Sequence, residues 1–222
     1  KLDISSQYLS RIIESYVDEH KKAIAQIANK LSIIAPSDYD DSLSKTHEFY
    51  PGFLTMLIAN QDADLVASSP RSLMDNLPKA GFSISDRSYF TQAFYHQSLY
   101  TSPVFLGRGF GSDPIIAISA PLYAKNSKSP TGIVEGSLNL NMFDQVNRYA
   151  ANDRQIDVVL TDENDNVIYA ESSLSLTKLA KFNASFDHIE LQDKFMIIDT
   201  HGANMKRYLY RRVTLNNGWK VL

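Results

Sequence analysis

The 222-residue sequence has no cysteine, which excludes a disulfide scaffold, a thiol nucleophile, a zinc ribbon and an iron–sulfur site. It also lacks an excess of charge of either sign, because 22 basic and 25 acidic residues leave a formal net charge of −3. That balance excludes a strongly basic nucleic-acid-binding protein and an acidic disordered tail. A hydrophobic fraction of 44%, with 12 tyrosines and 11 phenylalanines, is typical of a folded protein with an ample core.

Long apolar runs are missing too. None approaches the roughly 20 residues that a helix needs to span a bilayer, and the longest, at 53–59, is interrupted by Thr55 and has the length of a strand. The sequence opens at Lys1 without an initiator methionine and stops inside an apolar, β-like stretch at 219–222. We therefore expect an excised fragment of a longer protein. A processed or tag-cleaved complete protein is the alternative.

Residues 2–35 are predicted to form one long helix. Apolar residues recur there at spacings of three and four, and neither glycine nor proline occurs before Pro36. At 1.5 Å per residue such a helix is about 50 Å long, which exceeds the diameter of a 100-residue domain. Something must therefore pack along both of its halves. A free coiled-coil stalk is the alternative, but the apolar stripe is not a strict heptad.

A second, short helix at 40–50 precedes a strand-rich block. The alternation of apolar residues and the turn residues between them predict strands at 53–59, 64–68, 100–105, 114–121 and 131–140. The first two form a hairpin, and a helical piece at 87–97 lies between the second and the third. Two strands, then a helix with loops, then three antiparallel strands is the order of a PAS-like sheet.

The same pattern then begins again on a smaller scale. A helical or irregular stretch is expected at 174–186, and strands at 156–160, 167–170, 195–199, 207–213 and 218–222. The predicted fold class is α+β, with the long N-terminal helix packed along two PAS-like units that each have a central antiparallel sheet. We expect the two helices in 1–48, a first unit in 49–147 and a second in 148–222, with the boundary between 144 and 155.

Catalytic constellations are not found. The histidines show neither His-Glu-x-x-His nor any other metal-ligand spacing, and no Gly-x-Ser-x-Gly marks a nucleophile elbow. The five histidines are His20, His47, His96, His188 and His201. Gly107, Gly109 and Gly111 superficially resemble a phosphate loop, but they join two predicted strands, so a hairpin loop is favoured. We predict no catalytic residue, no metal and no cofactor, and an enzyme with a dispersed active site is an alternative.

Two polar segments have weaker functional interpretations. Asp162, Asn164 and Asn166 match the first half of a calcium loop, but valine replaces the required glycine and serine the required glutamate, so 162–166 is interpreted as a solvated turn. Five basic residues near the end have no acidic neighbours, which is typical of a polar sheet face or of a surface close to an anionic membrane. They are Lys206, Arg207, Arg211, Arg212 and Lys220.

Four segments carry a resemblance to a known family. The first, 86–93, reads Asp-Arg-Ser-Tyr-Phe-Thr-Gln-Ala and is similar to the family signature Asp-Arg-x-Tyr-Phe-x-x-Ala; the others are 100–105, 116–123 and 132–140. In their order and spacing they resemble the double Cache (dCACHE, tandem PAS-like) sensor domains of bacterial receptors. The long first helix and the closing Asn-Gly-Trp-Lys-Val agree, so the resemblance covers essentially the whole chain.

This resemblance implies an extracytoplasmic sensor, on the periplasmic side of an inner-membrane protein. In the family the first helix follows one transmembrane segment and the last strand leads into another, and neither segment is in this chain. The family's cytoplasmic outputs are histidine kinases, diguanylate cyclases and chemotaxis transducers. The implied partners are a small-molecule ligand and a second copy of the chain, which would dimerise through the N-terminal helix. No nucleic acid is implied.

The candidate ligand site lies in the first unit. The guanidinium of Arg87 can hold a carboxylate through two hydrogen bonds, and the aromatic residues beside it would form an apolar wall. The candidate ligand-binding residues are Arg87, Tyr89, Phe90, Ser102, Phe105, Ser119, Glu135 and Ser137. The alternatives are an ion pair of Arg87 with Asp86 or another acid, and an ordinary core role for the aromatic residues.

One departure from the family pattern bears on the ligand. Amine-sensing members carry an aspartate where this chain has Ser137, and they often have tryptophan where Tyr89 stands. An ammonium group would lack its counter-charge here unless Glu135 supplies it, and Glu135 shares a strand face with Ser137. We therefore favour a small carboxylate over an amino acid. A ligand-free dimerisation module remains an alternative. The second unit, with about 70 residues, is too small for a sizeable cavity and is predicted to transmit rather than bind.

Overall fold

The computed structural model describes residues 2–75, 77, 82–108, 113–143, 156–182, 186–190, 195–200 and 207–222. By their contacts the residues form two compact units. The six-stranded unit comprises Val17–Ser102 and Leu106–Asn139, and the two-sheet unit comprises Lys1–Tyr16, Pro103–Phe105 and Leu140–Leu222. The predicted boundary at 144–155 lies outside the described residues. The first helix is divided between the two units after Tyr16, and the short segment Pro103–Phe105 is grouped with the two-sheet unit. The predicted domain divisions stay predictions.

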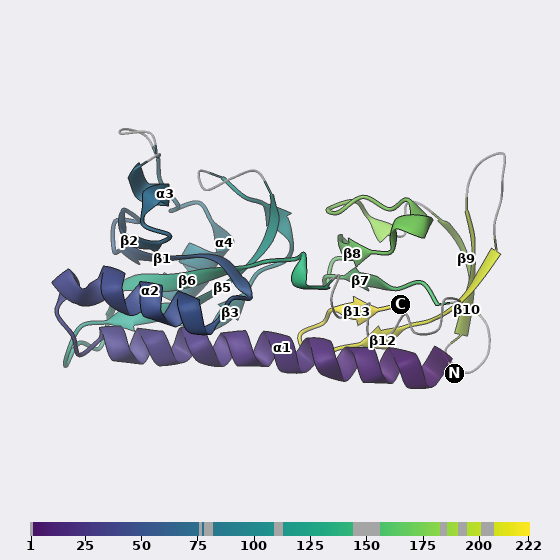
Figure 1. Cartoon of the computed structure of the whole chain (residues 1–222), viewed down its shortest axis with the longest axis horizontal. Helices are drawn as coiled ribbons and strands as arrows, with labels where there is room; N and C mark the ends of the chain where they lie inside the picture. Colours follow the sequence, from purple (N-terminus) through teal and green to yellow (C-terminus); the bar gives the residue numbers. More distant parts are fainter. Residues whose placement is uncertain are drawn as a thin grey trace. The chain divides into compact units, whose positions relative to one another are not determined.

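The long first helix is confirmed. Helix α1 spans Leu2–Leu31, and its buried stripe includes Leu9, Ile13, Ile24 and Leu31 (Figure 1). The helix ends four residues earlier than predicted, because Pro36 disfavours helical geometry at the preceding residue and Ala35 is extended, with φ −72° and ψ 146°. Pro36 then begins a short 3-10 helix, η1, at Pro36–Asp38.

The six-stranded sheet has the order β2-β1-β6-β5-β3 (Figure 1), and these neighbouring strands pair antiparallel. Strand β4 also pairs with β5. The strands are β1 Phe53–Asn60, β2 Leu65–Ser69, β3 Tyr100–Thr101, β4 Phe105–Leu106, β5 Pro114–Tyr123 and β6 Pro130–Leu138. The strand predicted at 100–105 is therefore two short strands. Strands β5 and β6 form the middle of the sheet.

The register of the central strands separates two faces. Leu57 of β1, Glu135 of β6 and Ser119 of β5 lie abreast, as do Met56, Gly136 and Ile118 one position along. A Cβ atom at Gly136 would come within 2.5 Å of the Phe53 ring and 3.0 Å of Ile24 of α1. A side chain at Gly136 would therefore displace the Phe53 ring, and this face of β6 packs closely against Ile24 of α1. Because side chains alternate along a strand, Glu135 lies on the opposite face.

Three further helices belong to the six-stranded unit: α2 Tyr39–Phe49, α3 Ser72–Asp75 and α4 Ser88–Phe94. Helix α2 is fixed by His47, whose ring nitrogens lie 2.9 Å from Ser69 Oγ and 2.9 Å from the Phe53 carbonyl oxygen. Helix α4, shorter than the predicted 87–97, packs on β5 and β6. Tyr89, Phe90 and Ala93 form its buried side.

The two-sheet unit has a four-stranded sheet in the order β12-β13-β7-β8 and a three-stranded sheet in the order β11-β10-β9. The bounds are β7 Val159–Thr161, β8 Val167–Ala170, β9 Phe186–Glu190, β10 Phe195–Thr200, β11 Arg207–Arg211, β12 Val213–Thr214 and β13 Lys220–Val221, with a 3-10 helix η2 at Ser172–Leu174. The sequence did not predict β9. The strand predicted at 207–213 changes sheet at Arg212, so it is divided into β11 and β12.

Buried residues of the two-sheet unit include Val159, Val167, Phe182 and Tyr210, and Trp219 is 1% exposed. Among the described residues, no helix has the length and apolar character needed to cross a membrane.

Candidate functional site

The face of the six-stranded sheet that bears Ser119, Glu135 and Ser137 is here called the polar face. Glu135 and Ser137 share it because they are two residues apart on β6, and Ser119 is paired directly with Glu135. Helix α4 covers this face: the Ser119 hydroxyl donates to the Tyr89 carbonyl oxygen over 2.8 Å. That single bond fixes the start of α4 above the centre of the sheet.

Glu135 is the most unusual residue of the polar face, because it is ionisable and 0% exposed. Its Oε1 accepts a hydrogen bond from Ser137 Oγ at 2.8 Å, whereas its Oε2 has no partner in the part of the chain that the structure describes. Burial raises the pKa of Glu135 to about 8, although the Ser137 bond acts in the opposite direction. At neutral pH the side chain is therefore mainly a neutral acid.

Tyr89 projects from α4 and is 7% exposed. Burial is the main cause that raises the pKa of its phenol, and the nearby charge of Glu135 raises it further. The charges of Arg87 and Arg108 lower the same pKa, and that of Asp86 raises it. Charges from the loop before α4, from Arg108 after β4 and from Glu135 of β6 therefore act on one phenol. That Arg87 and Glu135 belong to one ligand site stays a prediction.

Arg87 caps the start of α4 with an extended backbone, φ −80° and ψ 135°. The neighbouring acid, Asp86, is bound by Arg108. Arg108 donates to both oxygens of Asp86, at 2.6 and 3.1 Å, and to the Ser83 carbonyl oxygen at 2.7 Å. This exposed clamp lowers the pKa of Asp86 chiefly through the Arg108 hydrogen bond. Sequence reasoning missed Arg108, because its glycine-flanked position was interpreted only as a hairpin loop.

The other predicted site residues have evident structural roles. Ser102 is fully buried, its Oγ accepts from the Ala117 amide and its own amide donates to the Ala117 carbonyl, both at 2.9 Å. Phe90 is 0% exposed and stacks on Phe94 with ring centroids 5.3 Å apart. Phe105 is half-buried, and its contacts group it with the two-sheet unit. The polar face thus bears Ser119, Glu135 and Ser137, and α4, which carries Tyr89, covers it. That Arg87 forms a ligand site with them stays a prediction.

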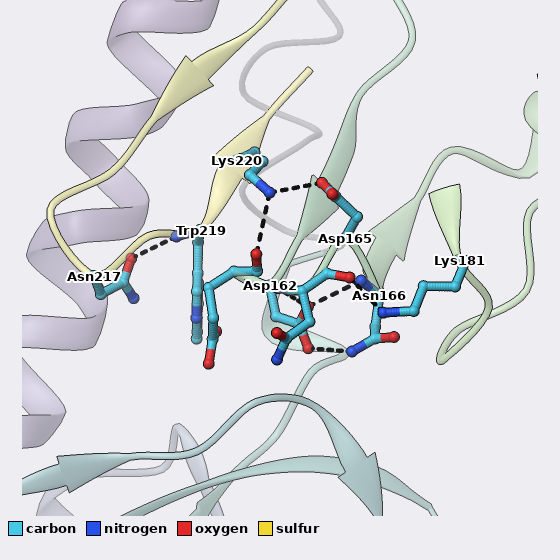
Figure 2. A network of polar contacts seen from close by, with 9 residues as sticks. Asp162, Asp165, Asn166, Lys181, Asn217, Trp219 and Lys220 are labelled. Carbon is cyan, nitrogen blue, oxygen red and sulfur yellow. Dashed lines mark hydrogen bonds and ion pairs between the residues drawn. The ribbon is translucent and has the colours of Figure 1, made fainter. Parts of the chain in front are cut away.

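A second buried carboxylate lies in the two-sheet unit, where the sequence predicted a solvated turn. That prediction is wrong for Asp162, which is 0% exposed. Its Oδ1 accepts the amides of Asn164 and Asn166, both at 2.9 Å, and its Oδ2 accepts Asn166 Nδ2 at 2.7 Å (Figure 2). Its Oδ2 also accepts the Val104 amide at 3.2 Å. Every lone pair direction is used by N–H donors, which fits a structural anchor.

The outer side of the same turn is held by a lysine. Lys220 of β13 donates to Asp165 Oδ1 at 2.7 Å and to the Glu163 carbonyl oxygen at 3.2 Å (Figure 2). Burial raises the pKa of Glu163. Within the described residues, no group of three or more His, Cys, Asp or Glu side chains could hold a metal ion.

The two-sheet unit also has a small apolar pocket of about 140 Å³, lined in part by Val159, Phe182, Tyr210 and Leu222. Pockets that hold drug-sized ligands usually enclose roughly 300–1,000 Å³. The prediction that this unit transmits rather than binds is not tested by this pocket and stays a prediction.

No family model and no curated protein matches the sequence. Solved structures do match the fold. The Pseudomonas aeruginosa amino acid chemoreceptor PctB ligand-binding domain, in complex with L-Arg, has a TM-score of 0.78 at 14% identity, covering 99% of this chain and 84% of that chain. The Mlp24 ligand-binding domain with asparagine has 0.69 at 15% identity, covering 99% and 88%.

An extracellular ligand binding receptor from Desulfohalobium retbaense has a TM-score of 0.73 at 10% identity, and the match covers 99% of this chain but only 39% of that one. Identities this low speak for the fold rather than for a shared ligand. They confirm the predicted α+β class, with an N-terminal helix and antiparallel sheets. The chain has the fold of chemoreceptor ligand-binding domains.

Proposed function

We propose that this chain is the extracytoplasmic ligand-sensing domain of a bacterial transmembrane receptor of the double Cache type, and that it binds a small molecule at the polar face. The observation that carries the proposal is Glu135, a fully buried carboxyl group with one unpartnered oxygen in the described structure. Buried polar atoms are usually hydrogen-bonded, and leaving one without a partner costs stability. A ligand that donates a hydrogen bond to Oε2 would supply the missing partner and would account for the buried carboxyl group at this position.

The charges around Tyr89 support an ionic ligand. Arg87 is half-buried at the start of α4, and its guanidinium can grip a carboxylate with two parallel hydrogen bonds. A small carboxylate held by Arg87 is therefore the proposed ligand class. Domains of similar fold were solved with GABA, L-Arg, asparagine and L-alanine, each of which carries a carboxylate.

The receptor context follows from the same proposal. The domain would lie on the periplasmic side of an inner membrane and signal to a cytoplasmic histidine kinase, diguanylate cyclase or chemotaxis output. Pairing of two copies through α1 is supported by Ile4 and Tyr8, which lie one helical turn apart and are 75% and 56% exposed. Apolar side chains left exposed on a helix often mark a partner surface.

A ligand-free dimerisation module is the second candidate. It is favoured by the complete burial of Phe90, Ser102 and Ser119, which shows that much of the predicted site is filled by the chain's own atoms. In this interpretation the polar face would be a core with one poorly satisfied acid, and α1 would carry the function.

Thermal melts separate the two candidates. The isolated domain would be scanned with the standard L-amino acids and with small carboxylates, alongside Arg87→Ala and a matched control, Arg11→Ala, at an exposed position of α1. We expect at least one carboxylate-bearing compound to raise the wild-type and Arg11→Ala melting temperatures. Arg87→Ala should lose about 30-fold or more in affinity, because removing one partner of a buried charged pair costs about 2–5 kcal/mol.

Two results would count against this. If no compound raises the wild-type melting temperature, the dimerisation module is favoured over the sensor. If a compound does so and Arg87→Ala responds equally, the carboxylate is not held by Arg87.

A further inference from the structure

Glu135 has a donor on one oxygen only. It sits on β6, between Leu57 of β1 and Ser119 of β5, and Ser137 donates to its Oε1. Ser119 is already committed as a donor to the Tyr89 carbonyl. In the described structure no side chain donates to Oε2, although the residue is completely buried.

The titratable and charged groups on this side of the sheet do not replace the missing partner. Tyr89 and Arg87 come from α4 and its cap, the Asp86–Arg108 pair from the loops beside it, and Tyr100 from β3, where it is paired with Ser119. The charges of Arg87, Arg108 and Asp86 act on the Tyr89 phenol. The pKa of Glu135 itself is set by burial and by Ser137, with burial the larger cause.

We propose that Glu135 exchanges its proton for an ammonium group of the ligand, so that binding of an amine-bearing ligand to the polar face releases one proton. This rests on the proposed function and adds the cationic half of the ligand to it. The step balances: the neutral carboxylic acid and the incoming R–NH3⁺ give a carboxylate–ammonium pair and one free H⁺. Oε2 becomes an acceptor for an ammonium N–H, and no buried charge is left without a partner.

The exchange also explains why a buried acid is compatible with a stable ligand-free domain. A buried carboxylate without a counter-charge is strongly disfavoured, and such a group keeps its proton instead. The ammonium of a ligand makes the charged form favourable. A carboxylate on the same ligand can pair with Arg87, since the charges of Glu135 and Arg87 both act on the Tyr89 phenol.

Proton release has a measurable signature. Where Glu135 is protonated in the free domain, the apparent affinity for an ammonium ligand rises about tenfold per pH unit, because one proton leaves for each ligand bound. This slope applies between about pH 5 and 7, where alkylammonium groups remain charged. A ligand that has only a carboxylate shows no such slope from Glu135.

The experiment uses the wild-type domain labelled with ¹³C at glutamate side chains, together with Glu135→Gln and the matched control Glu163→Gln in the two-sheet unit. NMR titration of the ligand-free protein should show a resonance that titrates near pH 8, lost in Glu135→Gln and kept in Glu163→Gln. A Glu135 resonance that titrates at the ordinary glutamate pKa would overturn the proposal.

Three probes of matched size then test the exchange: L-alanine, ethylamine without the carboxylate and propionate without the ammonium. At pH 6.5, L-alanine and ethylamine should convert the Glu135 resonance to its ionised position, and propionate should not. If L-alanine fails to bind, the amino acid that gives the largest thermal shift replaces it, with its own deaminated and decarboxylated analogues.

The outcomes separate the exchange from the sensor function. If the carboxylate analogue binds and neither the amino acid nor the amine ionises Glu135, the exchange is overturned and the ligand-sensing proposal still stands. An amine that binds without changing the Glu135 resonance would also overturn the exchange and leave the ligand-sensing proposal standing. If no amine or carboxylate binds at all, the proposed function fails, and the exchange fails with it.

Discussion

Glu135 and Asp162 are both 0% exposed carboxyl groups, one in each unit, yet their surroundings differ completely. Asp162 accepts from three backbone amides and one side-chain amide. Glu135 accepts from one hydroxyl, and its second oxygen has no partner among the described residues. Burial alone therefore does not tell a carboxyl group whose hydrogen bonds are complete from one that has an open acceptor. The number and kind of hydrogen-bond donors around the group distinguish the two.

The physical basis of this contrast is the cost of removing a charge from water. Hydrogen bonds to the ionised form offset part of that cost, and the bonds that N–H donors make to a carboxylate are among the strongest hydrogen bonds in proteins. Asp162 accepts hydrogen bonds from N–H donors of the protein on both of its oxygens. Glu135 has a donor on one oxygen only among the described residues, so its charged form needs a further partner.

The largest expected effect follows from removing the anchor. Asp162→Ala leaves the amides of Val104, Asn164 and Asn166 without their acceptor inside the two-sheet unit. An unsatisfied buried donor costs about 1–3 kcal/mol, and we expect a total loss of about 3 kcal/mol or more in the free energy of unfolding, measured by urea denaturation. A loss under about 1 kcal/mol would show that Asp162 is not an anchor.

The next effect is a pH dependence that belongs to Glu135 alone. Because the pKa of Glu135 is raised to about 8 in the folded domain, the folded state keeps a proton that the unfolded state releases near its ordinary pKa. The stability contribution is complete below the unfolded pKa, declines as the pH rises and is lost above about pH 8.

Between pH 5 and 7 the wild type should therefore lose about 2–3 kcal/mol of stability relative to Glu135→Gln, at about 1.4 kcal/mol per pH unit. Urea denaturation of both proteins at pH 5, 6 and 7 without ligand gives this difference directly. Parallel curves for the two proteins would mean that Glu135 titrates normally and would remove the contrast with Asp162.

The smallest effect is expected at the outer side of the Asp162 turn. The Lys220–Asp165 pair is partly exposed, with 17% and 29% of the two side chains accessible. Such pairs contribute about 0.2–1 kcal/mol. A double-mutant cycle of Lys220→Ala and Asp165→Ala should give a coupling energy in that range, which salt reduces. A coupling well above 1 kcal/mol would make this pair, rather than Asp162, the main support of the turn.

The sequence predicted the helices and strands better than it predicted the burial and hydrogen bonding of individual side chains. The 3.6-residue period of α1 and the alternation in β1, β5 and β6 are local signals, so these elements were found within a few residues. Alternation also placed Glu135 and Ser137 on one face. Strand β9 was missed because its Phe-Asp-His-Ile-Glu sequence is short and polar and takes its place only through pairing with β10.

Asp162 and Asp86 show why hydrogen bonds between residues far apart in the sequence could not be predicted from it. Asp162 stands in the polar sequence Asp-Glu-Asn-Asp-Asn, which indicates solvent. One of its donors is the amide of Val104, 58 residues away, and no local pattern reveals that hydrogen bond. The clamp of Arg108 on Asp86 spans 22 residues, and sequence reasoning had considered Arg87 for that acid.

The contrast between Glu135 and Asp162 depends on Glu135 being a neutral acid at neutral pH. Infrared difference spectroscopy of wild type minus Glu135→Gln measures this protonation state, since a protonated carboxyl group has a carbonyl band that a carboxylate lacks. We expect this band in the ligand-free domain at pH 6.5, and its disappearance at pH 9.5. A difference spectrum with only carboxylate bands at pH 6.5 would show that Glu135 is ionised there and would refute the proposed proton exchange.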